Sequence, residues 1–228
     1  MIEFVFLDLD DTLFDFKLAE RIAIGRTLEE LGVAPEEKIL KRYSEINKSC
    51  WEKLERGEYT REEVLVNRFA LLFSEIGSDV EPLTARRLYE KKLGIGHYFI
   101  DGATELLDTL YGKYKLYITS NGTKPVQDPR IASSGIARYF DKIFISEVVG
   151  ANKPSPEFFK RVFGEIEGFD KERAIIVGDS LTSDILGGKN AGIKTCLFNP
   201  KKKANTTGII PDYEISSLYE LDGLLKTL

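Results

Sequence analysis

The stretch FVFLDLDDTLFD, residues 4–15, decides the fold of this chain. Its first four residues are apolar and predict a short buried strand. Asp8 and Asp10 follow at the carboxyl end of that strand, where parallel α/β sheets carry their reactive groups. Two carboxylates at such a point repel each other, and a metal ion on one with a proton on the other relieves the repulsion. A nucleophile beside a proton donor and a cation is the minimum needed to displace a phosphoryl group.

The composition of the 228 residues excludes several classes of protein. A hydrophobic content of 43% and a charged content of 30% are typical of a globular protein. The net charge of -5 argues against stable nucleic-acid binding. No apolar run reaches the roughly 18 residues of a membrane span, and the N-terminus shows no secretory signal. We therefore expect a cytoplasmic protein, with Cys50 and Cys196 as free buried thiols.

Residues 17–93 show a helical pattern throughout. Apolar residues recur at spacings of three and four, and Thr60 with Glu63 forms a capping box before one such run. The glycines expected to end the helices are Gly32, Gly57, Gly77 and Gly94. The pattern predicts four helices packed as a small antiparallel bundle.

After residue 100, helices alternate with strands, which is typical of parallel strands joined by right-handed crossovers. The predicted strands are residues 115–119, 142–146, 174–178 and 194–198. The first strand must join the same sheet, because a lone strand is not stable. We therefore predict an α/β fold with a Rossmann-like parallel-sheet core, residues 1–15 and 97–228, and an inserted all-helical cap domain, residues 16–96. The cap is expected to lie over the carboxyl ends of the strands as a lid.

Three further polar groups follow the ends of predicted strands. Ser120 can donate its hydroxyl and its backbone N–H to a phosphate oxygen, and Lys153 can offset the charge of phosphate and nucleophile. Asp179, with Asp8 and one backbone carbonyl, gives the sparse set of oxygen ligands that magnesium prefers.

Pro129 lies inside the helix predicted after Ser120 and is expected to kink or delay it.

Four motifs together resemble a known family. They are FLDLDDTLFDF (6–16), SNG (120–122), NKP (152–154) and GDSLTSDILGGKNAGIKT (178–195). In this order they look like the signature motifs of the haloacid dehalogenase (HAD) superfamily of aspartyl phosphatases. The inserted helices resemble the type 1 cap of that superfamily.

The resemblance implies a role for each motif residue. Asp8 attacks phosphorus and forms an aspartyl-phosphate, while Asp10 protonates the leaving group and then activates water. Mg²⁺ is the implied cofactor, held by Asp8, the backbone carbonyl of Asp10 and Asp179. The residues implied to bind the phosphoryl group are Ser120, Asn121 and Lys153. The resemblance implies that Asp184 and Thr12 hold these contacting residues in place and do not themselves bind the phosphoryl group.

Two residues of the predicted cap indicate which kind of substrate the protein could bind. Asn47 and Trp51 stand four residues apart and hence on one face of a helix. Asn can hydrogen-bond a base and Trp can stack on it, although Trp51 in a helix interface and Asn47 in solvent are equally compatible with the pattern. Phe14 either lines the mouth of the pocket or seats the cap, and Arg68 is expected at the surface or in an ion pair.

Further stretches resemble the pyrimidine 5′-nucleotidase branch of the superfamily, which acts on nucleoside monophosphates: INKSCWEKLERG (46–57), ISEVVGANKPSPEFF (145–159), GDSLTSDILGG (178–188) and YEISSLYEL (213–221). The leading hypothesis is therefore a Mg²⁺-dependent phosphomonoester hydrolase for pyrimidine nucleoside 5′-monophosphates, a monomer or homodimer whose partner is a small phosphorylated metabolite. A phosphatase for sugar phosphates or N-acylneuraminate 9-phosphate is the alternative among enzymes. A catalytically idle binding or regulatory protein on the same fold is the alternative of another class, but none of its usual losses of nucleophile, acid or lysine is seen.

Overall fold

The computed structural model describes all 228 residues and contains one parallel six-stranded sheet. Its strands are β1 (Phe4–Leu7), β2 (Lys115–Ser120), β3 (Lys142–Ile145), β4 (Ala174–Gly178), β5 (Lys194–Phe198) and β6 (Tyr213–Ile215). They lie in the order β3-β2-β1-β4-β5-β6, so β1 is central and pairs with both β2 and β4. The predicted α/β fold with a parallel-sheet core is confirmed. The short strand β6 was not predicted.

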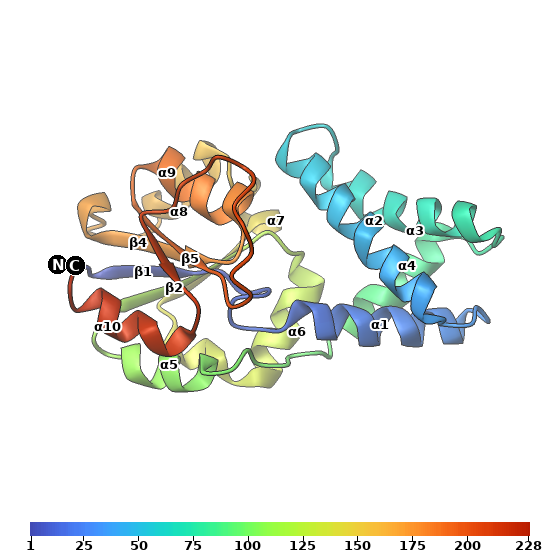
Figure 1. Cartoon of the computed structure of the whole chain (residues 1–228), viewed down its shortest axis with the longest axis horizontal. Coiled ribbons are helices and arrows are strands. Elements are labelled where there is room, and N and C mark those ends of the chain that lie inside the picture. The colour runs from blue at the N-terminus through green and yellow to red at the C-terminus, as the bar shows by residue number, and fades with distance from the viewer.

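Helices cover both faces of the sheet (Figure 1). Side chains of β1 alternate between the faces: Val5 and Leu7 join the apolar cluster that includes α5 (Ala103–Leu110) and α10 (Leu221–Leu225). Phe4 and Phe6 join the opposite cluster, which α8 (Pro156–Gly164) covers. All four β1 residues are buried, as expected of a central strand. The remaining core elements are α6 (Lys124–Ser134), η1 (Ile136–Tyr139), α7 (Ser146–Val149), η2 (Lys171–Arg173), η3 (Leu181–Ile185), α9 (Leu186–Ala191) and η4 (Leu218–Glu220).

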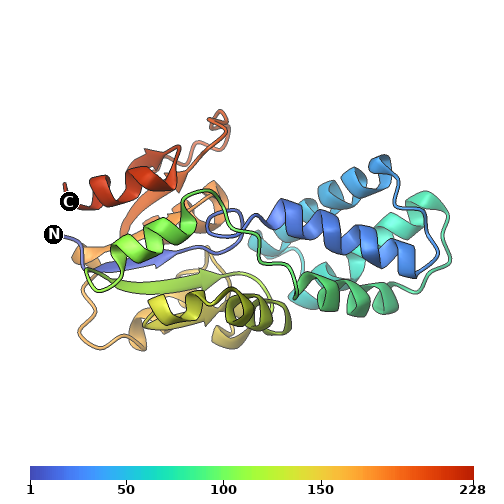
Figure 2. The same ribbon diagram turned by 90° about the horizontal axis from the view of Figure 1, so that it is seen from below.

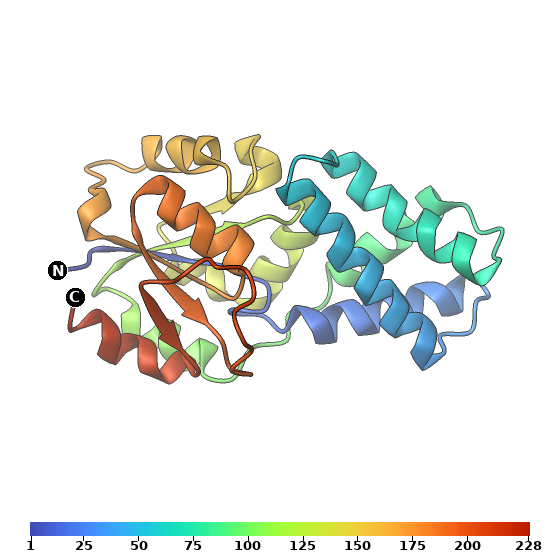
Figure 3. The ribbon, with the colours of Figure 1, turned by 45° about the horizontal axis from the view of Figure 1, so that its top comes forward.

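The segment between β1 and α5 forms a four-helix bundle with its own apolar core. Its helices are α1 (Phe16–Glu30), α2 (Glu37–Glu55), α3 (Arg61–Ile76) and α4 (Pro82–Leu93). Three aromatic rings, those of Tyr43, Phe69 and Tyr89, meet at the centre of this core. The bundle stands at one end of the sheet, and both chain termini lie at the opposite end (Figures 2 and 3). The boundaries given above for core and cap remain a prediction.

Local signals in the cap are largely borne out. Thr60 and Glu63 form the expected capping box at the start of α3, and Gly77 ends that helix in the left-handed conformation.

Cys50 and Cys196 are buried and unpaired, as predicted. No helix of the structure has both the length and the apolar character that crossing a membrane requires.

Helix α6 corrects the expectation that Pro129 delays it. It begins at Lys124 and continues through Pro129 to Ser134, so the helix is neither delayed nor interrupted. Pro125 occupies the first turn, where a missing N–H costs nothing. Pro129 packs on the end of α4, where Gly94 has no side chain and a Cβ would lie 3.2 Å from the proline ring.

Gly188 of α9 lies where this helix touches the sheet most closely. A Cβ at this position would lie 2.5 Å from Cγ2 of Ile176 and 2.7 Å from Cγ2 of Thr195. We predict that Gly188→Ala lowers the free energy of unfolding by about 1–3 kcal/mol, because the helix must move off the sheet to admit the methyl group. Chemical denaturation measures the change.

Gly25 in α1 provides the matched control. No atom lies within 4 Å of a Cβ built there, so Gly25→Ala is expected to raise the free energy of unfolding by up to about 1 kcal/mol through better helix propensity. Equal effects of the two substitutions would contradict the close approach of α9 to the sheet.

Candidate active site

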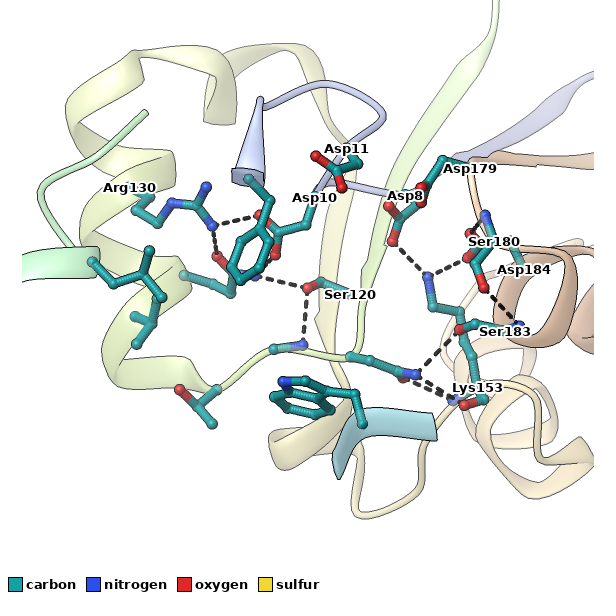
Figure 4. Close-up of a pocket in the computed structure, with 18 of the residues that line it drawn as sticks. Asp8, Asp10, Asp11, Ser120, Arg130, Lys153, Asp179, Ser180, Ser183 and Asp184 are labelled. Atoms are coloured by element: carbon teal, nitrogen blue, oxygen red, sulfur yellow. Dashed lines mark hydrogen bonds and ion pairs between the residues drawn. The ribbon is translucent and has the colours of Figure 1, made fainter. Parts of the chain in front are cut away.

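The predicted site residues of the core gather at the carboxyl ends of neighbouring strands (Figure 4). Asp8 follows β1, Ser120 ends β2 and Asp179 follows β4, while Lys153 belongs to the loop between α7 and α8. All four line one cavity of about 240 Å³. The order of strands reverses beside β1, and such a reversal opens a crevice in which α/β proteins bind ligands.

Lys153 forms the centre of this site. It is 1% exposed, and its Nζ donates to Oδ1 of Asp8 at 2.8 Å, to Oδ1 of Asp184 at 2.6 Å and to the carbonyl of Thr119 at 2.7 Å. Burial lowers the pKa of a lysine, but the two carboxylates more than compensate and raise the pKa of Lys153 above its ordinary value. The ammonium group therefore stays charged at neutral pH.

Three carboxylates form an acidic cluster around this lysine. One oxygen each of Asp8, Asp179 and Asp184 lies within 4.8 Å of the others. Burial, together with the charges of Asp184 and Asp11, raises the pKa of Asp179 to about 7. Burial also raises the pKa of Asp8 well above its ordinary value, against the opposing charge of Lys153. One lysine does not balance three carboxylates, two of them buried and that of Asp179 half-buried, so this donor set suits a divalent cation that prefers oxygen ligands.

Hydrogen bonding separates the roles of the three acids. Both oxygens of Asp184 are occupied, one by Nζ of Lys153 and the other by a backbone N–H 3.1 Å away. Asp179 accepts no hydrogen bond, and Oδ2 of Asp8 accepts only that of the Thr12 hydroxyl, at 3.2 Å. Asp8 and Asp179 therefore have oxygens available for a cation. Asp184 and Thr12 instead orient the groups that surround it.

Asp10 is held by two residues of α6 that were not predicted (Figure 4). Nη1 of Arg130 donates to Oδ1 of Asp10 and Nε2 of Gln127 donates to its Oδ2, both at 2.6 Å. Gln127 also donates to Oγ of Ser120 at 2.9 Å, and Nε of Arg130 donates to the carbonyl of Gly96 at 2.6 Å. The spacing of three places both side chains on one face of the helix that follows Ser120, and this signal was available in the sequence.

The turn that carries Asp10 is tight. Asp11 has a φ of 62°, in the left-handed region that residues other than glycine seldom adopt. The N–H groups of Leu13 and Phe14 both donate to the carbonyl of Leu9 and close the turn. Phe14 is fully buried in the core cluster and does not line the cavity, so the first of its two expected positions, the mouth of the pocket, is wrong.

Asn121 joins two loops of the site. Its Oδ1 accepts from the backbone N–H of Lys153 at 2.9 Å, and its Nδ2 donates to the Lys153 carbonyl at 2.9 Å and to Oγ of Ser183 at 3.2 Å. Both amide protons are thus used within the protein. A contact between Asn121 and phosphate would have to come from its backbone.

Two polar contacts attach the bundle to the core beside the cavity, and neither was predicted. Arg61 of α3 donates to two backbone carbonyls of the loop after β2, at 2.9 and 3.0 Å, to Oγ of Ser146 at 2.6 Å and to Oδ1 of Asn152. The hydroxyl of Thr182 donates to Oε2 of Glu55 at 2.7 Å. The structure therefore places the cap helices directly over the strand ends.

The cap helices form the wall of the cavity opposite the strand ends. Their lining residues are Phe16, Trp51, Glu55, Leu65, Arg68, Glu90 and Leu93. Arg68 is buried and lines the cavity, so the expected surface position is wrong, whereas its Nη2 lies 4.0 Å from Oε1 of Glu90 and forms the ion pair that was the other expectation. Asn47 does not reach the cavity, because it is 2% exposed and its amide lies between Oε1 of Glu20 and Nη1 of Arg68, at 2.7 and 3.1 Å. Direct contact of Asn47 with a substrate is therefore not supported.

Known proteins are similar to this chain in sequence and fold. The haloacid dehalogenase-like hydrolase family matches residues 5–198. YfnB of Bacillus subtilis is 40% identical over 96% of this chain and 93% of its own length. Two pyrimidine 5′-nucleotidases are also similar: PynA of Streptococcus pneumoniae is 38% identical over 96% of this chain and 93% of its own, and YjjG of Escherichia coli is 31% identical over 98% and 97%.

Solved structures agree with these matches. A crystal structure of YfnB bound to magnesium, in which interdomain movement is described, has a TM-score of 0.94 at 39% identity and covers 98% of both chains. L-2-haloacid dehalogenase from Xanthobacter autotrophicus, at 19% identity and a TM-score of 0.80 over the whole of both chains, has the same fold. The motif residues at the strand ends, the family match and these relatives lead to one conclusion: the chain belongs to the haloacid dehalogenase-like hydrolase family.

Proposed function

We propose that this hydrolase is a phosphatase that cleaves phosphomonoesters through an aspartyl-phosphate on Asp8. The observation that carries the proposal is the meeting of Asp8, Lys153 and Asp179 around one cavity, with Asp10 beside them. A nucleophile, a fixed positive charge, a set of cation ligands and a proton donor are the parts that phosphoryl transfer requires.

The chemistry assigned to the chain's own residues runs in two steps. A carboxylate oxygen of Asp8 attacks phosphorus in line as the ester P–O bond breaks, and Asp10 gives its proton to the leaving oxygen. Asp10 then takes a proton from the water that attacks the same phosphorus, which releases phosphate and restores Asp8. Lys153 and the donors of Ser120 offset the charge that builds up on the phosphoryl oxygens. Mg²⁺ on Asp8, Asp179 and the Asp10 carbonyl would supply further neutralisation.

The proposed substrates are pyrimidine nucleoside 5′-monophosphates. The similarity to PynA and YjjG supports this class. The cavity supports it as well, because Trp51 and Phe16 offer aromatic surface at its cap side while the charged groups stand at the strand ends. We further propose that residues 16–96 act as a lid that excludes bulk water during the reaction.

Removal of the nucleophile tests the mechanism. We predict that Asp8→Asn lowers kcat for p-nitrophenyl phosphate by at least about 1,000-fold, because an amide does not attack phosphorus. Phosphate release and circular dichroism are measured together, and the fold should remain. Asp79→Asn, a matched change at an exposed residue of the α3–α4 connection, should keep the wild-type rate. Turnover retained in Asp8→Asn would remove Asp8 from the role of nucleophile.

Removal of a proposed cation ligand tests the metal site without an activity assay. Magnesium should raise the melting temperature of the wild type and have little effect on Asp179→Asn, since a ligand of the native state stabilises it. The shift should be larger at about pH 8 than at about pH 6, because a proton competes with the cation at a carboxyl whose pKa is about 7. Equal shifts in both proteins would place the cation elsewhere.

A panel of phosphate esters tests the substrate class. The values of kcat/KM for uridine, thymidine and cytidine monophosphates should exceed those for purine monophosphates, glyceraldehyde 3-phosphate and N-acylneuraminate 9-phosphate, and EDTA should abolish all of them. One sugar phosphate far ahead of every nucleotide would favour the alternative phosphatase. No release from any ester would favour the idle binding protein.

A further inference from the structure

The cap wall of the cavity contains a charged pair that the proposed reaction does not use. Arg68 of α3 and Glu90 of α4 both line the cavity, among apolar neighbours such as Trp51, Leu65 and Leu93. Charged side chains in an apolar wall are costly unless a partner satisfies them. Their presence at the side opposite the nucleophile therefore calls for an explanation.

One hydrogen-bonding group of Arg68 has no partner in the protein. The residue is 3% exposed, its Nε donates to the carbonyl of Leu65 at 3.3 Å and its Nη1 donates to Oδ1 of Asn47 at 3.1 Å. Nη2 makes no hydrogen bond, and the nearest carboxylate oxygen, Oε1 of Glu90, lies 4.0 Å away. This distance is too long for a hydrogen bond. A buried guanidinium thus keeps donor capacity for a group that enters the cavity.

Neighbouring side chains of the cap hold the guanidinium of Arg68 in place. Its guanidinium lies 4.8 Å from the ring centre of Tyr89. Asn47 must turn its oxygen toward Arg68, which can only donate, and its Nδ2 toward Glu20, whose Oε1 is 2.7 Å away. Glu20, Asn47, Arg68 and Glu90 come from α1, α2, α3 and α4 in turn. All four cap helices therefore contribute to holding one donor at the wall of the cavity.

Arg68 and Glu90 together match a ligand group that has a hydrogen-bond acceptor next to a donor. Nη2 of Arg68 needs an acceptor. Oε1 of Glu90 already accepts from Nε of Arg86 at 3.0 Å, so Oε2 of Glu90 is the oxygen left to accept from a ligand. A heterocycle with a carbonyl oxygen next to a ring N–H offers both on one edge, and uracil and thymine have such an edge. Phosphate does not, because at neutral pH it offers mainly acceptors, which Glu90 would repel.

We propose that Arg68 and Glu90 recognise the edge of the substrate's base, with Arg68 donating to a ring carbonyl and Glu90 accepting from the adjacent N–H. This assignment rests on the proposed nucleotidase function and adds the residues that select the base. Asn47 and Glu20 act as positioning residues for Arg68 and do not touch the substrate.

Two substrates that differ only in the base separate this contact from phosphate chemistry. Uridine 5′-monophosphate and ribose 5-phosphate share the sugar phosphate, so the ratio of their kcat/KM values measures recognition of the base. Arg68→Met, which keeps length and loses the donors, should lower this ratio by about 100-fold, mainly through KM for the nucleotide. Glu90→Gln should lower the preference for uridine over cytidine monophosphate, because cytosine has no N–H at the equivalent ring position.

A matched arginine provides the control. Arg42 of α2 pairs with Glu75 at the surface and does not line the cavity, so Arg42→Met should leave the ratio unchanged. Arg68→Lys, which keeps the charge, should recover part of the ratio if the fold is intact. Melting temperatures of all variants identify any that fail to fold.

Binding is followed without turnover in the Asp8→Asn background. Trp51 is the only tryptophan of the chain and lines the cavity, so its fluorescence should change with uridine monophosphate and little with ribose 5-phosphate. Arg68→Met should weaken nucleotide binding in this assay by a similar factor of about 100.

The outcomes distinguish the two proposals. A wild type that prefers uridine monophosphate, with an unchanged ratio in folded Arg68→Met, would overturn the assignment of Arg68 and leave the nucleotidase function standing. A wild type that hydrolyses ribose 5-phosphate as well as the nucleotide, or hydrolyses neither, would overturn both.

Discussion

The buried ammonium group of Lys153 is the constraint on which the rest of the site depends. It donates to Asp8, which follows β1, to a carbonyl of β2 and to Asp184 of η3, which follows β4, so three strand ends are held at one point. The acids need the lysine, because carboxylates this close would otherwise repel each other in a buried place. The lysine needs the acids, because a lone buried ammonium group is costly. Each half of this arrangement therefore stabilises the other.

Under the proposed function, the sheet wall of the cavity carries out the chemistry and the cap wall selects the substrate. The sheet supplies a rigid row of strand ends, where parallel neighbours place their loops at one edge. The bundle supplies side chains from helices, whose exposed residues can change without disturbing the sheet. A fixed reaction centre with an exchangeable cap explains how one family fold can serve relatives with different names and substrates.

The core could be predicted from the sequence because each motif follows a strand that is apolar enough to be recognised. The cap could be predicted only as helices. Periodicity tells which residues share a face, but it does not tell what lies opposite, so Asn47 and Trp51 were assigned together although only Trp51 reaches the cavity. Arg61 and Arg68 depend on the packing of distant segments in the same way. The three residues of β6 are too few for a periodic signal.

The hydrogen bonds of Arg130 couple the position of the bundle to that of Asp10. Its guanidinium binds the carbonyl of Gly96, on the return connection from the bundle, and the carboxylate of Asp10. A swing of the bundle about that connection would pull the carbonyl away from the arginine and loosen its hold on Asp10. If Asp10 carries the proton as proposed, it would be held in place only while the bundle is seated, and proton transfer would then depend on the opening and closing of the cavity.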